Sequence, residues 1–541
     1  MTNKIVLSLS MFLAIILFFT KLESTPPAIY SDESTVGYNA FSILKTGRDE
    51  YGKAFPLAFR FFGAYTPPLA VYFTVPFVYL FGLNPISVRL LSAISSLFLV
   101  VVLYRLATLL NLFKNKYVSA LCSLIFVTTP WVIFNARLGY EVTFGYALFY
   151  LGVLFVWRSY LLNRVSFWGL IFLSLSTYTA HTERYLVPLF LLCFLLIYRS
   201  KVFIKKNVTS LSKGILLLFV LHLPHLYLLT TPAFWVKNLA FGSGSLSLGI
   251  RDFIGQLIVY FSPQTYFGTL TSDINLQHFI PEISLFYSWQ LVLFVLGVFV
   301  LVTSPKTDSK KLLFLLLITS PIPGAFSGHF ISIQRVLPVI IPIILIIGIG
   351  IDEIITKTKK TYFVFLLLFL SFTFSLSLFY RSYFILLPGL RASWWSYGAQ
   401  DISEFIKSHP QEEIIIDNSR DQAIYSPIVF YNAFPPKQFQ KQFGQVLSKY
   451  YQNPSYSPVV SFAKVTTRPI NWEIDSLESK YLIGDSLAVS ADQAKEHFLT
   501  KVQTIKDKRG QVLYEIYKTN PKQKIDDNRT KLQKRTIIKN K

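Results

Sequence analysis

The side chains in this sequence that could do acid–base or phosphate chemistry are few, and most of them stand at the edges of long apolar runs. Two adjacent acids, Asp32 and Glu33, follow the first run, and Arg137 and Glu141 stand between two later runs. The remaining members of this set are His181, Glu183, Arg184, His329 and Arg335. A carboxylate within hydrogen-bond reach can take a proton from a hydroxyl group, and a guanidinium can hold a phosphate. The residue types therefore indicate proton transfer beside a bound phosphate.

Each of these residues also has a plainer explanation. Asp32 and Glu33 could cap the helix predicted for "STVGYNAFSILKTG", where acids suit the helix dipole. Arg137 and Glu141 could form an i,i+4 ion pair, and Arg335 could extend to the lipid headgroups. However, charged groups near a bilayer are costly unless they face water, a partner or a cavity. Because such groups recur in four separate loops, we favour a shared cavity.

The elements that must position these residues are membrane helices. The chain has 541 residues, of which 52% are hydrophobic and only 15% charged. Runs such as "GILLLFVLHLPHLYLLT" are long enough to cross a hydrocarbon core about 30 Å thick. The formal charge of +23 comes from Lys and Arg in short loops, which suits membrane orientation and anionic lipids better than nucleic acid. We therefore predict an all-α polytopic membrane protein with no nucleic-acid partner.

The loop charges predict a topology of about 11 transmembrane helices. The first run, residues 5–20, is interpreted as a retained signal anchor with a cytoplasmic N-terminus. The stretch 67–83 begins with two prolines and contains Pro76, so we expect it to pack at the outer interface or to re-enter. With that stretch not crossing, five basic loops fall on one side, which the positive-inside rule makes cytoplasmic. All the acids and bases named above then lie on the outer side.

Three parts are expected along the chain. Residues 1–380 form the transmembrane domain, with a large first outer loop at 21–85. Residues 381–520 mix apolar and polar residues as an α/β domain does: "EEIIID" predicts a strand and "SYGAQDISEFIKSHP" a helix. This domain is expected to be extracytoplasmic. Residues 521–541 are basic and weakly patterned, which predicts a disordered tail.

The opening of the chain resembles the GT-C superfamily of lipid-dependent glycosyltransferases, in particular the protein O-mannosyltransferase and aminoarabinose (lipid A) transferase group. Members of the group place an acidic pair in the first outer loop, as at Asp32 and Glu33, and follow it with Pro-Pro-Leu and an Arg-Leu. Here these are Pro67-Pro68-Leu69 and Arg89-Leu90. Later matches are Arg137 with Glu141 and the stretch "HFISIQRVLPVIIP". One departure is Thr66, where aminoarabinose transferases carry a lysine.

The resemblance implies an inverting transfer of a hexose or pentose from a polyprenyl-phosphate donor to an acceptor hydroxyl at the outer face of a plasma membrane. The acceptor would be a glycan, a lipid or a protein. By position, Asp32 would be the base, Glu33 would orient the loop or the acceptor, and Glu141 would assist. The donor phosphate would be held by Arg137, Arg335, His329 and, more weakly, Arg184. No obligatory metal is expected, although a divalent cation is possible.

A lipid-linked substrate transporter or flippase is the main alternative. Such a protein would place ionisable residues near the middle of the bilayer and often shows internal repeats. In this sequence the ionisable residues gather at one surface and no repeat is evident. The enzyme hypothesis therefore accounts for the pattern better.

Overall fold

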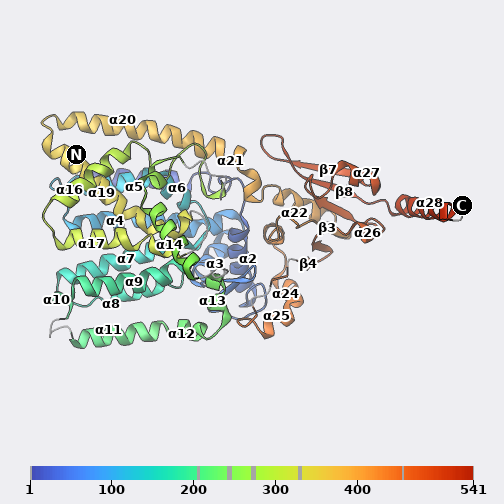
Figure 1. Cartoon of the computed structure of the whole chain (residues 1–541), viewed down its shortest axis with the longest axis horizontal. Helices are drawn as coiled ribbons and strands as arrows, with labels where there is room; N and C mark the ends of the chain where they lie inside the picture. The colour runs from blue at the N-terminus through green and yellow to red at the C-terminus, as the bar shows by residue number, and fades with distance from the viewer. Residues whose placement is uncertain are drawn as a thin grey trace.

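The computed structural model describes residues 3–203, 208–239, 246–269, 276–326, 332–453, 456–457 and 459–539. A body of packed helices occupies one end of the molecule and an α/β domain projects from the other, as Figure 1 shows. The N-terminus lies at the far end of the helical body, and the chain ends at the tip of the α/β domain.

The body is built from apolar helices that share one large core. Its principal helices are α1 (Asn3–Phe19), α4 (Pro85–Leu110), α5 (Val118–Thr128), α6 (Pro130–Ala136), α7 (Glu141–Leu161), α8 (Phe167–Ser176), α9 (His181–Ile197), α11 (Val208–Leu221), α12 (Leu223–Leu229), α14 (Leu246–Phe261), α16 (Gln290–Thr303), α17 (Asp308–Thr319), α19 (Ile340–Lys357) and α20 (Thr361–Tyr380). Helices α16 and α19 touch through their backbones: a Cβ on Gly297 would clash with the Ile346 carbonyl, and one on Gly350 with the Leu293 carbonyl. Small residues of this kind let membrane helices approach closely.

The helices make this a multi-pass membrane protein, but the predicted count of 11 spans is not confirmed. Among the described residues, four helices are long and apolar enough to cross a membrane, or up to six if each of two bent pairs is one span. The stretch predicted to re-enter, 67–83, contains α3 (Leu69–Phe81) with Pro76 inside it. A helix of this length spans about 20 Å, less than the hydrocarbon core, so α3 does not cross as a straight helix.

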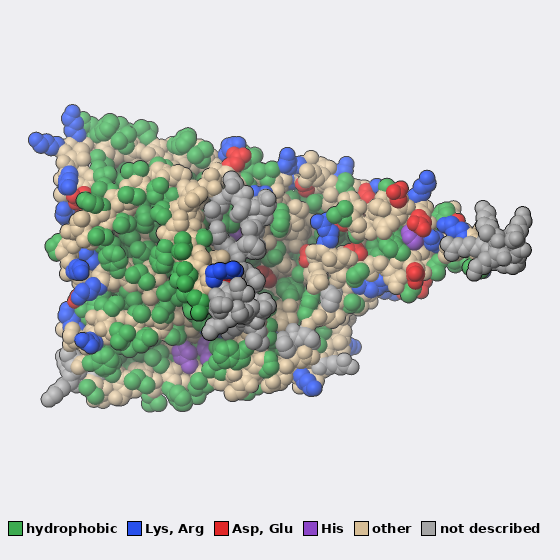
Figure 2. Space-filling model, in the orientation of Figure 1, with side chains coloured by type: hydrophobic (Ala, Val, Ile, Leu, Met, Phe, Trp, Pro, Cys, Tyr) green, Lys and Arg blue, Asp and Glu red, His purple; other side chains and the backbone are tan. Residues whose placement is uncertain are grey.

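Charge is distributed unevenly over the body. Figure 2 shows a flank covered largely by apolar side chains, with Lys and Arg side chains gathered at the end away from the α/β domain. This end holds the N-terminus (Figure 1). The distribution agrees with a set of basic loops that share one side of a membrane.

The segment 21–85, predicted to be the first outer loop, forms a compact unit between the body and the α/β domain. It contains α2 (Ser31–Thr46), the antiparallel strands β1 (Phe59–Phe61) and β2 (Ala64–Thr66), and α3. Glu33 accepts a hydrogen bond from the Tyr30 backbone at the start of α2, and Gly47 ends the helix in the left-handed conformation. A Cβ on Gly37 would lie 2.5 Å from Phe430 and 2.7 Å from Val88, so α2 is packed tightly between the two parts of the molecule.

The α/β domain has a six-stranded sheet in the order β4-β5-β3-β6-β8-β7, with parallel strands at its centre and antiparallel pairs at both edges. The strand expected in "EEIIID" is β3, and the helix expected in the preceding stretch is α22. Its elements are α22 (Ala399–Ser408), β3 (Ile414–Ile416), α23 (Tyr425–Tyr431), α24 (Pro436–Phe439), α25 (Gly444–Ser448), β4 (Val460–Phe462), β5 (Val465–Thr467), α26 (Trp472–Asp475), β6 (Tyr481–Gly484), α27 (Ala491–Glu496), β7 (Thr500–Lys506) and β8 (Val512–Lys518).

Two boundaries differ from the sequence expectation. The last apolar helix does not stop at residue 380, because α20 continues through a π-helical turn (Arg381–Leu386) and α21 (Leu387–Leu390). The segment 521–541, expected to be disordered, contains α28 (Pro521–Lys539). An ion pair between Lys531 and Asp527, four residues apart, supports this helix. The shorter connecting helices are α10 (Arg199–Val202), α13 (Pro232–Leu239), α15 (Pro263–Phe267), α18 (Ile322–Ala325) and the 3-10 helices Leu276–His278, Ile333–Val339, Ala392–Trp395 and Gln440–Phe443.

Candidate active site at the outer end of the helical body

Asp32 stands in the first turn of α2 and is half-buried. Two phenols lie close to it, those of Tyr30 and Tyr140, whose rings meet edge-to-face with centroids 6.2 Å apart. The pKa of each phenol is raised, first by burial and then by the negative charge of Asp32. Asp32 therefore places its charge beside two neutral hydroxyl groups at the junction of the helical body and the α/β domain.

Glu33, the neighbouring acid, is fully buried and is paired with an arginine. Arg89 of α4 binds it with two parallel hydrogen bonds of 3.0 Å each. The same guanidinium donates to the backbone carbonyls of Leu22, Pro26 and Ala28. Bidentate pairing of this kind fixes orientation as well as charge. The geometry suits the predicted role of orienting the loop and leaves Glu33 no open side toward an acceptor.

Glu141 reaches the same region through a glycine. The Glu33 carboxylate accepts a hydrogen bond of 2.6 Å from the Gly139 backbone, two residues before Glu141. A Cβ on Gly139 would lie 2.5 Å from Val88, so only glycine allows this approach. The charges of both Asp32 and Glu141 raise the pKa of Tyr140, after burial. The segments that carry the two acids thus meet at one end of the body, as the cavity hypothesis requires.

Arg137, predicted to hold a donor phosphate, makes mainly structural contacts. It is fully buried, and its guanidinium donates to the backbone carbonyls of Leu17, Lys21 and Thr25 and to the Tyr383 hydroxyl. These contacts tie the end of α1 and the following loop to the turn after α20. They occupy most of the guanidinium, so the geometry favours Arg335 and Arg184 over Arg137 as phosphate ligands.

The other predicted phosphate ligands fall into three situations. Arg335, in the 3-10 helix Ile333–Val339, is half-buried and lies within electrostatic range of Glu141 and Tyr260. Arg184, in the first turn of α9, is half-buried and stacks on Phe234, with its guanidinium carbon 5.2 Å from the ring centroid. His329 lies outside the described residues. Arg335 and Arg184 thus remain as candidate cations.

Sequence reasoning did not assign roles to several residues that complete the site. Gln277 donates to the Tyr140 hydroxyl at 3.5 Å, and the ring of His278 lies edge-to-face with Tyr140. Burial lowers the pKa of His278 to about 4, so this imidazole is neutral near pH 7. Neither residue carries a local sequence signal, because their long loop approaches Tyr140 only in the fold. Arg89, by contrast, was visible in the Arg-Leu motif.

In the part of the chain that the structure describes, no group of three or more His, Cys, Asp or Glu side chains is placed to hold a metal ion. Whether the reaction needs one stays a prediction.

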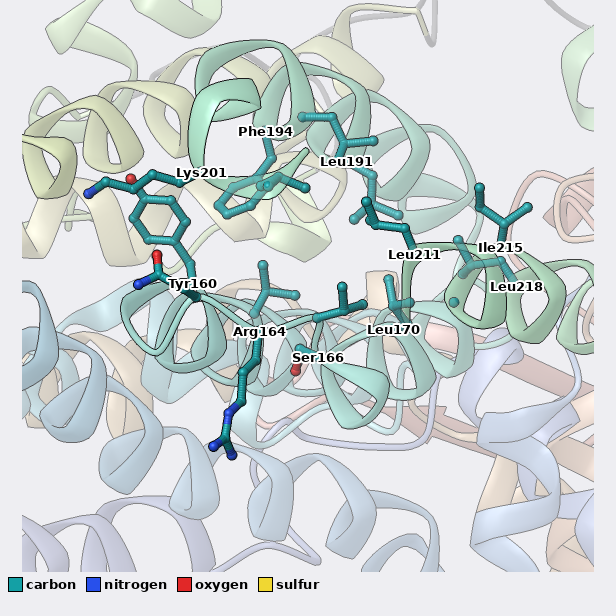
Figure 3. A pocket seen from close by; sticks show the side chains of 16 residues that line it. Tyr160, Arg164, Ser166, Leu170, Leu191, Phe194, Lys201, Leu211, Ile215 and Leu218 are labelled. Atoms are coloured by element: carbon teal, nitrogen blue, oxygen red, sulfur yellow. The ribbon is translucent and has the colours of Figure 1, made fainter. Parts of the chain in front are cut away.

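A mainly apolar cavity lies away from these acids. Figure 3 shows it between α7, α8, α9 and α11, with a volume of about 160 Å³. Its walls are mainly apolar, with Leu170, Leu191 and Phe194 among them, and Tyr160 and Lys201 lie at one end. Lys201 is already paired with Asp308 at 2.9 Å. This lining suits a hydrocarbon chain and offers no acid–base chemistry.

The arrangement described so far, a helical membrane body with a structured first loop and a projecting α/β domain, is a fold that solved structures share. In particular, the structure is similar to crystal structures of ArnT from Cupriavidus metallidurans. For ArnT bound to undecaprenyl phosphate the TM-score is 0.57 at 13% sequence identity, over 94% of this chain and 97% of that one. For the apo state the TM-score is 0.56 at 14% identity, with the same coverage.

More distant likenesses support no further argument. The oligosaccharyltransferase AglB from Archaeoglobus fulgidus gives a TM-score of 0.46 at 12% identity, over 92% of this chain and 70% of that one. No family model and no curated protein sequence matches the chain. At these identities the comparisons define the fold alone.

Proposed function

We propose that this protein is a membrane glycosyltransferase that moves a hexose or pentose from a polyprenyl-phosphate donor to an acceptor hydroxyl. The observation that carries the proposal is the contact between Glu33 and Gly139, which brings the segments of Asp32 and Glu141 together at one end of a GT-C fold. Membrane binding of the donor is in keeping with the fold, because the similar ArnT structure holds undecaprenyl phosphate.

In the proposed mechanism, Asp32 takes the proton from the acceptor hydroxyl as its oxygen attacks the anomeric carbon. The bond between that carbon and the phosphate oxygen breaks, and polyprenyl phosphate leaves with the electron pair. Because the base lies opposite the leaving group, the configuration at the sugar carbon inverts. General-base help of this kind typically supplies about 10²–10⁴-fold in rate.

The remaining groups have supporting tasks. Arg335 and Arg184 would stabilise the charge that grows on the leaving phosphate, since fixed cations act most strongly in a water-poor site. Glu141 would orient the acceptor from the opposite side of Asp32. Glu33 would hold the Asp32 loop through Arg89. Tyr140, kept neutral by its raised pKa, could donate a hydrogen bond to the sugar or to Asp32.

The charge distribution supports an orientation in the plasma membrane. With the Lys- and Arg-rich end in the cytoplasm, the N-terminus is cytoplasmic and the α/β domain extracytoplasmic (Figure 2). The acids then face the outer leaflet, where a lipid-linked donor and an envelope glycan, lipid or protein acceptor would meet.

The test is a turnover assay of the purified chain with a panel of polyprenyl-phosphate sugars, in which the release of polyprenyl phosphate is measured. We expect Asp32→Asn to lower turnover at least 100-fold, because it removes the base. The matched control is Asp492→Asn, which changes an exposed acid in the first turn of α27 and should leave turnover unchanged. Turnover of Asp32→Asn near the wild-type rate would remove the proposed base.

A further inference from the structure

The chemistry proposed above uses Arg184 but not the cluster of polar side chains beside it on the flank of the body. The cluster is formed by Tyr178, His222 and His225, with Arg184 and Phe234 beside them. The rings of Tyr178 and His225 stack with centroids 4.0 Å apart, and those of His222 and His225 lie 5.5 Å apart. The rings of His225 and Phe234 meet edge-to-face, and Arg184 stacks on Phe234.

A break between two helices creates this cluster. Helices α11 and α12 are bent by 51° relative to each other, and Pro224 follows the break. Proline cannot supply the backbone N–H that a continuous helix needs at this point. The Tyr178 hydroxyl donates to the Leu221 carbonyl at the break, which compensates for part of the lost pairing. Broken helices in membrane transport proteins commonly mark substrate sites for the same reason.

Two buried hydrogen-bonding atoms in this cluster have no partner within the described part of the chain: Nε2 of His225, whose side chain is 5% exposed, and Nε of Arg184. Leaving one such group unpaired costs on the order of 1–3 kcal/mol. Native structures rarely keep unpaired groups without a reason, and a bound ligand is one of the accepted reasons. The positive charge of Arg184 and its unpaired Nε both favour an anionic ligand with acceptor oxygens.

The surroundings indicate how that ligand arrives. Leu223, Leu226, Tyr227 and Trp235 expose between 42% and 53% of their surface next to the cluster. Figure 2 shows histidine side chains gathered near α12 on this otherwise apolar flank. Tryptophan and tyrosine favour the headgroup level of a bilayer. Such a surface favours a lipid, whose phosphate could enter from the headgroup level of the bilayer, over a water-soluble anion.

The cluster also adjoins the first outer loop. The Leu69 backbone donates to the Tyr178 carbonyl at 2.9 Å, and the His181 ring bonds the Tyr65 carbonyl at 2.8 Å. These contacts place it beside Thr66. A phosphate held at the cluster is therefore at the edge of the loop that carries Asp32.

We propose that His222, His225 and Arg184 form a lateral binding site for the phosphate of a membrane lipid at the break between α11 and α12. The His222 Nδ1 donates to the Leu218 carbonyl at 2.9 Å, which holds this ring beside that of His225. Arg184 supplies the charge, and His225 supplies a hydrogen bond from the protein side. The proposal rests on the proposed function only where the lipid is a polyprenyl phosphate.

The test is native mass spectrometry of the purified full-length chain titrated with undecaprenyl phosphate in one arm and phosphatidylglycerol in the other. We expect Arg184→Gln and His225→Phe each to weaken binding about tenfold or more, the usual effect of losing a hydrogen bond to a charged group. The half-exposed position allows His222→Phe as a further variant. His409→Phe is the matched control, since His409 also stacks on an aromatic ring, that of Phe405, but in the α/β domain.

Thermal unfolding separates this role from a structural one. Because the His225 Nε2 makes no hydrogen bond within the described chain, His225→Phe should leave the melting temperature unchanged or raise it. A lower melting temperature with unchanged lipid binding would overturn the proposal, and so would wild-type affinity for both lipids in all three variants. Weakened phosphatidylglycerol binding alone would assign the site to a phospholipid. Weakened undecaprenyl phosphate binding in the variants, together with a wild-type chain that binds this lipid but turns over no sugar donor, would keep this site and reject the proposed function.

Discussion

Two regions of this molecule hold an arginine at the end of the helical body that faces the α/β domain, and they differ in what the arginine meets. At Arg89 every guanidinium donor has a partner, either the Glu33 carboxylate or a backbone carbonyl. At Arg184 the Nε has none within the described residues, and the neighbouring His225 Nε2 has none either. A saturated cation holds the chain in place, whereas an unsaturated one can hold a ligand. The comparison therefore separates residues that position the site from residues that bind within it.

The largest effect is expected at the saturated pair. Glu33→Gln or Arg89→Met alone leaves a buried charge without its partner, which should lower the free energy of unfolding by about 3–5 kcal/mol. Changing both together should cost much less than the two single changes added, because no charge is then left unpaired. Thermal unfolding in detergent measures all three variants.

A surface pair provides the control for this cycle. Glu353 pairs with Lys114 and Lys357, whose side chains are 67% and 77% exposed, so Glu353→Gln should cost less than about 1 kcal/mol. If Glu33→Gln were no more harmful than Glu353→Gln, the interpretation of the Glu33–Arg89 pair as a structural clamp would be wrong.

An intermediate effect on stability is expected at Arg137, which the sequence did not distinguish from Arg335. Arg137→Gln removes hydrogen bonds to three backbone carbonyls and should cost about 2–3 kcal/mol of unfolding free energy. Arg335→Gln, at a half-buried position, should cost about 1 kcal/mol or less but should weaken binding of the donor. Melting temperatures and donor affinities of both variants measure the contrast. Equal loss of stability with unchanged donor affinity would place Arg335 among the structural residues.

These contrasts show how much of the fold and of the site the sequence could predict. Local patterns predicted α2 with its acidic first turn, strand β3, and a body made of membrane helices. They could not separate Asp32 from Glu33, because the partner that buries Glu33 is Arg89, 56 positions along the chain. They could not show that Arg137 meets the carbonyls of Leu17 and Thr25, since backbone carbonyls leave no mark in a sequence.

The span count and the tail show the limits of composition. Short or bent helices such as α5 with α6 have the composition of a span but not its length, so loop charges alone do not fix the number of spans. The tail is polar enough to look disordered, yet its spacing allows the pair between Lys531 and Asp527 along α28. In both cases composition does not determine the length or the local geometry of a helix.

An effect that depends on pH sharpens the comparison at a residue that combines features of both regions. Glu50 is almost fully buried between α2 and the α/β domain, as in the clamp, but its hydrogen-bond partner is the neutral Asn39 rather than a cation. Burial raises the pKa of Glu50 to about 8, and that of Asp49 to about 6. The ionisable groups that face Glu50 electrostatically are Asp49, Arg60, Tyr38, Tyr51, Tyr425 and Tyr456.

The sign of the pH dependence follows from this raised pKa. The folded chain holds the Glu50 proton more tightly than the unfolded chain, so stability from this group is greatest below about pH 4.5 and falls as the pH rises toward 8. One such group changes the free energy of unfolding by at most about 1.4 kcal/mol per pH unit. Glu50→Gln keeps the hydrogen bond to Asn39 without the titration, so its melting temperature should fall less than that of the wild type between pH 5 and pH 8. The exposed Glu473→Gln should follow the wild type throughout. If the melting temperatures of the wild type and Glu50→Gln changed with pH in parallel, the charged form of a buried acid without a hydrogen-bonded cation would be tolerated here. Burial alone would then no longer distinguish the two regions.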